Sequence, residues 1–269
     1  HGRDLFVPVA DLDWILQGAD LITTITPFHR DRILRAGLPS ERVALLPCPV
    51  ALPAVPALPP MPGGPLRVLC VGRLVPKKGH DLLLRSCARL AAGGLPVELT
   101  LVGDGPLGLE LRALASRLQA SVPLLQVEMT GACPVERVEA ELRFGRYHVA
   151  ALACRVAEDG DRDGVPVFLL EALAHGVPVL TSALPGFDSE LREGEGSWLL
   201  PTHPGPGGVE EPAVESIAQA LADLHADAPG RAAAGLAAWM HAEQRIRPAE
   251  IGAHLLEMLL RLCSKLRRP

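Results

Sequence analysis

The sequence predicts an α/β fold in which helices wrap a parallel sheet. From residue 66 onward, short apolar runs alternate with helical stretches, a pattern typical of strands whose two faces are covered by crossover helices. Several of these runs are followed directly by glycine-containing loops. With 269 residues, of which 48% are hydrophobic, the chain has room for one large core or two smaller ones.

Residues 1–46 are expected to be the remnant of a first domain. The run at 21–26 is rich in β-branched residues, as strands are. Pro27 stands where a helix can begin, and Gly37 stands where it can end. The elements predicted for this segment are a helix at 13–19, a strand at 21–26, a helix at 27–36 and a strand at 42–46.

Residues 47–65 are predicted to be a linker between domains. Proline recurs eight times in these nineteen residues, and such a composition favours an extended, semi-rigid spacer.

A second domain is predicted at 66–230, with further helices at 231–269 that include one at 248–266. Its strands are expected at 67–71, 97–102, 126–130, 148–154, 178–181 and 197–200. Its helices are expected at 79–92, 106–119, 135–142, 166–175 and 212–226. Six such units form a Rossmann-like domain, whose ligand crevice lies at the carboxyl ends of the strands.

Two acids and a basic loop carry the chemistry predicted for this domain. Asp163 precedes the helix expected at 166–175, and Glu171 lies inside that helix. Arg73 and Lys78 lie on the loop after the first strand, which holds two of the three lysines of the chain. Carboxylates bind hydroxyl groups, whereas a guanidinium and an ammonium bind a diphosphate. The combination suits a sugar nucleotide, although the basic loop alone could be solvated surface.

Each acid also has a structural alternative. Asp163 could cap its helix and still leave backbone N–H groups directed at an anion. Glu171 lies in an apolar run, where a carboxylate is costly unless a hydrogen bond compensates it.

Residues 66–200 resemble the donor-binding domain of a retaining GT-B glycosyltransferase of family 4. The pair Asp163 and Glu171 matches the family's acid-x7-acid signature, which usually begins with Glu rather than Asp. The stretch at 158–166 is similar to the polysaccharide-building branch of the family, including colanic-acid-type enzymes.

The resemblance implies a GT-B fold with a complete C-terminal Rossmann-like domain and part of an N-terminal one. The family has a His-Gly pair like that at 1–2 midway through its acceptor-binding domain, so we expect the chain to be truncated and inactive alone. The last helix is expected to pack back toward the first domain. The implied catalytic residues are His1, Arg73, Lys78 and Asp163, and the implied donor-binding residues are Gly72, Gly103, Gly105, Gly164, Val165, Pro166 and Glu171.

The activity implied is transfer of a sugar from a nucleotide-diphosphate sugar to an acceptor hydroxyl with retention of configuration, in polysaccharide or glycoconjugate biosynthesis. Arg73, Lys78 and the helix amino terminus near Gly164 would stabilise the departing diphosphate. Because these groups supply positive charge, no metal or cofactor is expected. The implied partners are a nucleotide sugar and a glycan or lipid-linked acceptor, in the cytoplasm or at the inner face of a membrane.

Two alternatives remain open at this stage. Residues 103–108 satisfy G-x-G-x-x-G, with Glu128 further on, which is the pattern of a dinucleotide site in an NAD-dependent oxidoreductase. Their place after the second strand counts against this, because that fingerprint belongs to the first strand-to-helix turn. The other alternative is an inactive relic that still binds sugar nucleotides.

Composition excludes other classes. The net charge of −5 argues against a general nucleic-acid binder, which would be basic. No uninterrupted apolar run reaches the length of a membrane span. Six scattered cysteines without a C-x-x-C pair give no zinc or redox motif.

Overall fold

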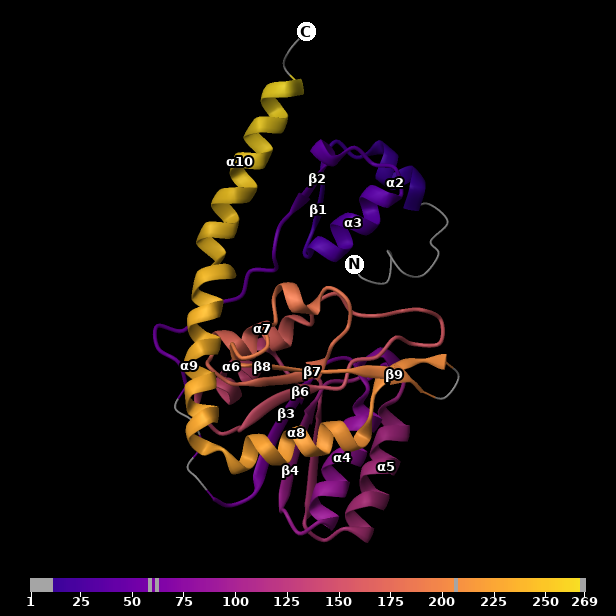
Figure 1. Cartoon of the computed structure of the whole chain (residues 1–269), viewed down its shortest axis with the longest axis vertical. Helices are drawn as coiled ribbons and strands as arrows, with labels where there is room; N and C mark the ends of the chain where they lie inside the picture. The colour runs from indigo at the N-terminus through magenta and orange to yellow at the C-terminus, as the bar shows by residue number, and fades with distance from the viewer. Residues whose placement is uncertain (1–11, 58–59, 61–62, 206–207, 267–269) are drawn as a thin grey trace.

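The computed structural model describes residues 12–57, 60, 63–205 and 208–266. Its main body is a six-stranded parallel sheet between helices, and a small N-terminal segment lies beside it (Figure 1). A long helix at the carboxyl end projects past both parts (Figure 1).

The N-terminal segment has the predicted order of helix, strand, helix and strand. Thr26 caps the second helix, since its hydroxyl accepts a hydrogen bond from the backbone N–H of His29, and Pro27 opens the helix as predicted. The two strands pair in parallel. The elements are α2 (Leu12–Gly18), β1 (Ile22–Thr24), α3 (Pro27–Arg35) and β2 (Val43–Leu45), with a 3-10 turn, η1 (Ser40–Arg42), before the last strand.

The large sheet has the order β5-β4-β3-β6-β7-β8, and all of its strands are parallel. Each strand was predicted to within one or two residues, because parallel strands covered on both faces read as continuous apolar runs. The strands are β3 (Leu66–Val71), β4 (Val97–Val102), β5 (Leu125–Gly131), β6 (Val149–Leu152), β7 (Val179–Ser182) and β8 (Ser197–Leu200).

Helices cover both faces of this sheet (Figure 1). One face carries α4 (His80–Ala92), α5 (Gly108–Ser121) and α8 (Val214–Ala226), and α6 (Val135–Arg143) and α7 (Val167–Ala174) lie on the other. The core between these layers is almost entirely aliphatic. Its fully buried side chains include Leu69, Leu101, Leu152 and Leu169.

The strand order reverses between β3 and β6, which are neighbours at the centre of the sheet. The chain leaves β3 toward one face and β6 toward the other, so the loops after these two strands part above the sheet. In an open parallel sheet such a switch point forms the ligand crevice.

One feature after β8 was not predicted. An antiparallel hairpin of β9 (Thr202–Pro204) and β10 (Glu210–Pro212) precedes α8. The helix α9 (Ala228–Arg245) then leads to α10 (Pro248–Leu266), whose bounds match the prediction. The helix α10 is directed toward the side on which β1 and β2 lie (Figure 1), but Leu256 and Leu260 on it are 58% and 62% exposed. Its packing against the first domain therefore stays a prediction.

The N-terminal segment contacts the main body at two glycines. A Cβ atom on Gly164 would lie 2.8 Å from Cδ1 of Ile25 and 3.0 Å from Cε1 of His29. A Cβ atom on Gly186 would lie 3.1 Å from Cβ of Phe28. The start of α3 thus lies directly against the loops that follow β6 and β7.

Candidate functional site

The loops at 72–79 and 153–166 meet above the switch point. The first contains a 3-10 turn, η2 (Pro76–Lys78), and ends at Gly79 in the left-handed conformation with φ of 61°. A Cβ atom on Gly79 would lie 1.8 Å from the carbonyl oxygen of Ala153, so only glycine permits this approach. The close contact holds the basic loop against the acidic one.

Opposite charges pair across this contact. Nζ of Lys78 lies 2.8 Å from Oδ2 of Asp163, and each of these side chains is only 14% exposed. Nζ of Lys77 lies 3.1 Å from Oδ1 of Asp161 and 3.6 Å from Oδ1 of Asp163. The structure thus brings together two predicted residues, Lys78 and Asp163, and adds Lys77, to which no role was assigned.

Lys78 stays charged in this environment. Burial favours the neutral amine, but the Asp163 carboxylate and smaller contributions from neighbouring groups together outweigh it, and the pKa of Lys78 is raised. The Cys154 thiol, whose Sγ lies 3.8 Å from Oδ2 of Asp163, is kept neutral because burial raises its pKa to about 12. Asp163 therefore has a permanent cation on one side and a neutral thiol on the other.

Arg155 ties two elements to the basic loop, and sequence reasoning missed it. Its guanidinium donates to the carbonyl oxygen of Pro76 at 2.9 Å and to the carboxylates of Asp81 at 2.6 Å and Glu211 at 2.8 Å. Its backbone N–H donates to the carbonyl oxygen of Lys77 at 2.9 Å. One mostly buried side chain thus connects η2 with the first turn of α4 and with β10.

Arg73 differs from the other cations of the site because its side chain is exposed. Within the part of the chain that the structure describes, no hydrogen bond or ion pair involves its guanidinium. It lines an open groove that lies between the basic loop, α4 and the hairpin, and that also contains Lys77, Arg85, Arg155 and five carboxylates. Arg73 is thus placed at the crevice with its donors available.

Asp163 does not cap the helix that follows it, so that structural alternative is wrong. The N-cap position of α7 is occupied by Pro166, which has no side-chain capping bond. The loop continues for two residues beyond Asp163 before that proline, and the carboxylate is directed to the lysines instead. Gly164, Val165 and Pro166 lie between this ion pair and the amino terminus of α7.

Glu171 is half-buried on α7, and no described residue donates a hydrogen bond to its carboxylate. Burial raises its pKa, and the nearby Glu139 of α6 raises it further. The backbone carbonyl of Glu171 is occupied, because Nδ1 of His175 lies 2.8 Å from it. A carboxylate placed in this way needs a donor from outside the protein or remains a cost to folding.

The loop at 103–108 packs directly on the basic loop. A Cβ atom on Gly103 would lie 1.9 Å from the carbonyl oxygen of Gly72, and one on Gly105 would lie 2.6 Å from that of Leu74. These glycines therefore have a packing reason that is independent of any ligand, and this weakens the dinucleotide alternative.

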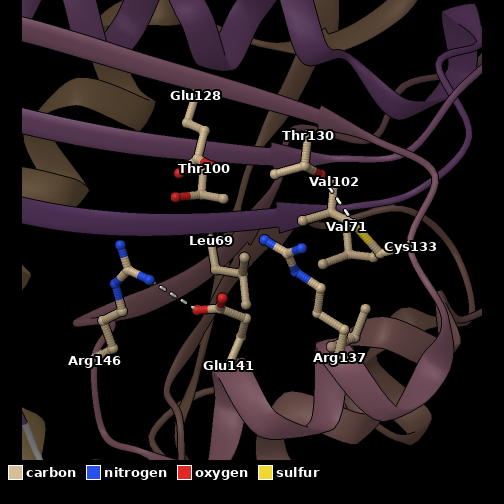
Figure 2. A pocket seen from close by; sticks show the side chains of 11 residues that line it. Leu69, Val71, Thr100, Val102, Glu128, Thr130, Cys133, Arg137, Glu141 and Arg146 are labelled. Atoms are coloured by element: carbon tan, nitrogen blue, oxygen red, sulfur yellow. Dashed lines mark hydrogen bonds and ion pairs between the residues drawn. The ribbon is translucent and has the colours of Figure 1, made fainter.

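A polar cavity of about 130 Å³ lies between β3, β4, β5 and α6 at the same end of the sheet (Figure 2). Arg137 and Glu141 project into it from α6, and Thr100 and Glu128 face them from the strands (Figure 2). Nη1 of Arg146 lies 3.2 Å from Oε2 of Glu141 across the cavity mouth. Of the predicted residues, none lines this cavity.

The remaining predicted residue, His1, lies outside the described residues. Among the described residues that could ligate a metal, no group of three or more His, Cys, Asp and Glu side chains gathers. In the described part of the chain, no helix is long and apolar enough to cross a membrane.

Comparison with known proteins identifies relatives of this chain. Residues 65–227 match the family model described as "Glycosyl transferases group 1". The chain is 31% identical over 192 residues to the putative colanic acid biosynthesis glycosyltransferase WcaL of Salmonella typhimurium, covering 70% of this chain and 45% of that protein. It is 30% identical over 277 residues to a GDP-mannose-dependent phosphatidylinositol monomannoside mannosyltransferase of Mycolicibacterium smegmatis, covering 96% of this chain and 68% of that protein.

The fold is also similar to solved structures. The Anabaena protein HepE, solved with UDP and glucose, superposes with a TM-score of 0.71 at 18% identity, covering 92% of this chain and 64% of that one. This likeness confirms the predicted α/β fold class of GT-B type. The chain spans about half the length of the colanic-acid relative that it matches.

Proposed function

This chain belongs to the glycosyl transferases group 1 family, and from that premise we propose that it is the donor-binding part of a retaining glycosyltransferase that uses a nucleotide-diphosphate sugar. The observation that carries the proposal is the cluster at the switch point. Arg73 is exposed there, Lys78 and Asp163 pair in the loops that precede α4 and α7, and Glu171 on α7 has no hydrogen-bond donor among the described residues.

Each group has a part in the proposed reaction. Arg73 and Lys78 bind the diphosphate and stabilise the charge that develops when the bond from the anomeric carbon to the phosphate oxygen breaks. Asp163 orients the sugar hydroxyls, and Glu171 accepts hydrogen bonds from the ribose hydroxyls. The bond to the acceptor oxygen forms on the same face of the sugar, and the acceptor proton passes to an oxygen of the departing diphosphate.

Two bases are candidates for the donor. The mycobacterial relative is named for GDP-mannose, and the Anabaena neighbour was solved with UDP. The acceptor we propose is a glycan or a lipid-linked saccharide of a polysaccharide pathway, as in the relatives named for colanic acid and for a phosphatidylinositol mannoside. A lipid-linked acceptor would bring the protein to a membrane surface.

Binding rather than turnover tests this proposal, because acceptor recognition is expected to need sequence that this chain does not contain. Calorimetric titration with UDP and with GDP should show binding of at least one of them. Arg73→Ala should weaken it about 10- to 150-fold, which corresponds to about 1.5–3 kcal/mol for a hydrogen bond to a charged group. Arg117→Ala, which removes an exposed arginine from α5, is the matched control and should change nothing.

The absence of binding by both diphosphates, or equal affinity in the two arginine variants, would sink the proposal. Binding of NAD in place of both diphosphates would instead support an oxidoreductase. Diphosphate binding by a longer chain that includes an acceptor domain yet transfers no sugar would indicate the inactive relic.

A further inference from the structure

A second cavity lies at the opposite end of the sheet from the crevice. Pro56 and Ala57 of the linker form one wall, and His148, immediately before β6, forms another. Arg231, in the first turn of α9, closes it. The cavity has a volume of about 170 Å³, which is room for several groups of the size of a water molecule, each about 30 Å³.

Arg231 is only 3% exposed, and of its three guanidinium nitrogens only Nη1 has a hydrogen-bond partner among the described residues. Nη1 donates to the backbone carbonyls of Leu224 and His225 at the end of α8. Nε is buried without a hydrogen bond, and no described atom accepts from Nη2. The edge formed by Nε and Nη2 is the one that binds an oxyanion through two parallel hydrogen bonds.

His148 offers a further donor. It is 1% exposed, and its Nδ1 accepts a hydrogen bond from the backbone N–H of Arg67 at 3.0 Å. Burial, followed by the positive charge of Arg231, lowers the pKa of His148 to about 4, so the ring is neutral at pH 7. A neutral ring that accepts at Nδ1 carries its proton on Nε2, which is buried and has no partner.

No carboxylate lines this cavity. Arg231 is the only lining residue with a formal charge, and within the described residues it forms no ion pair. Burial lowers the pKa of Arg231, and the charge of nearby Asp227 partly offsets this, although Asp227 forms no ion pair with it and instead caps α9 by accepting from the N–H of Gly230. Glu98 pairs with Arg67 at 2.9 Å. His225, whose ring centroid lies 5.4 Å from that of His148, adds no negative charge. A buried guanidinium with an unpaired donor and no direct ion pair is costly.

We propose that this cavity binds a small oxyanion of the size of inorganic phosphate. The Nε and Nη2 edge of Arg231 and Nε2 of His148 would donate to it. The bound anion would fasten the linker to α9, which already meet where Nε1 of Trp239 donates to the carbonyl of Pro53 at 3.2 Å. The site is independent of the proposed transferase function, because it lies at the amino ends of the strands.

Thermal melting of the whole chain tests the proposal, with inorganic phosphate exchanged for chloride at constant ionic strength. The melting temperature of the wild-type protein should rise with phosphate. A rise should persist in Arg73→Ala, which removes a cation from the crevice, so that phosphate bound there is distinguished from phosphate bound in this cavity. The same response should be lost in Arg231→Met.

His148→Asp gives the sharper test, because Arg231→Met removes packing as well as charge. One carboxylate oxygen can keep the hydrogen bond from Arg67, and the other can face Arg231 and replace the anion. This variant should melt higher than wild type without phosphate and should gain nothing from it. If it does not fold, Ala232→Glu, which places a carboxylate on the α9 wall, carries the same expectation.

If the melting temperature of the wild-type protein does not change with phosphate, the proposal is overturned and water is the occupant. An undiminished phosphate response in a folded carboxylate variant would overturn it as well. Neither result bears on nucleotide binding at the crevice, which is read by calorimetry.

Discussion

Nζ of Lys78 and Oδ2 of Asp163 lie 2.8 Å apart, so the protein neutralises this lysine internally. Both side chains are largely buried, and the nearby Lys77 keeps a second cation beside the same carboxylate. A diphosphate that enters the crevice must therefore share Lys78 with Asp163 or displace it. This competition sets the expected behaviour of variants at both positions.

Asp163→Asn should separate folding from binding. Removing one partner of a buried pair leaves an uncompensated ammonium, so the free energy of unfolding should fall by about 2–4 kcal/mol. Affinity for UDP or GDP should be kept or increased, since Lys78 is released for the phosphates. Urea denaturation and calorimetry on the same preparation measure both quantities. Loss of diphosphate affinity in a fully folded Asp163→Asn sample would contradict the assignment of Lys78.

Arg155→Lys should loosen the basic loop. A lysine cannot reach the Pro76 carbonyl and the carboxylates of Asp81 and Glu211 together, so stability should fall by about 2–4 kcal/mol and diphosphate affinity should fall with it. The control is Arg89→Lys, whose guanidinium is 60% exposed in a surface pair and should matter little. Equal stability and affinity in the two variants would show that Arg155 does not position the loop.

Glu171→Gln should weaken nucleotide binding without harming the fold. Because the pKa of Glu171 is raised in the folded state, its charge destabilises the protein above that pKa, and the effect vanishes as the pH falls below the unfolded value of 4.5. The variant should thus be more stable than wild type at pH 7, and the gap should close toward pH 4.5. Melting curves across this range measure the gap, and a variant less stable at neutral pH would indicate an internal partner instead.

Gly164→Ala should disturb the contact between the N-terminal segment and the main body. The added methyl group would meet Ile25 and His29 at 2.8 and 3.0 Å, so we expect a loss of about 1–2 kcal/mol. Hydrogen exchange should locate the loss in α3 and β1. Gly108→Ala at the start of α5 is the control, because its new atom would meet neighbours at an ordinary 3.7 Å. Faster exchange in the control than in the test variant would contradict this account.

The strands of the large sheet could be predicted because burial on both faces leaves a local signature. The strand β4 was predicted to the residue from the run VELTLV, which is mostly apolar. The hairpin of β9 and β10 was missed because its strands are three residues long and contain prolines and glutamates, which give no alternation. The start of α9 was hidden by the turn-like Pro229 and Gly230.

The site was predictable where its residues share a motif and unpredictable where only the fold joins them. Arg73, Lys78 and Asp163 could be chosen from two short stretches. The role of Arg155 depends on Asp81 and Glu211, 74 and 56 residues away in the chain, and no spacing in the sequence indicates such contacts. The direction of the Asp163 side chain was open for the same reason, since its partner comes from another strand's loop.

The two glycines beneath the start of α3 have a mechanical consequence. Gly164 and Gly186 present bare backbone to Ile25, Phe28 and His29, so at these two positions no side chain projects back toward α3. Two surfaces whose side chains interlock resist sliding, whereas a surface of bare backbone resists it less. At these two positions a small shift of the N-terminal segment over the loop that carries Asp163 would meet no side chain, and a bulkier residue at either glycine would hinder such a shift.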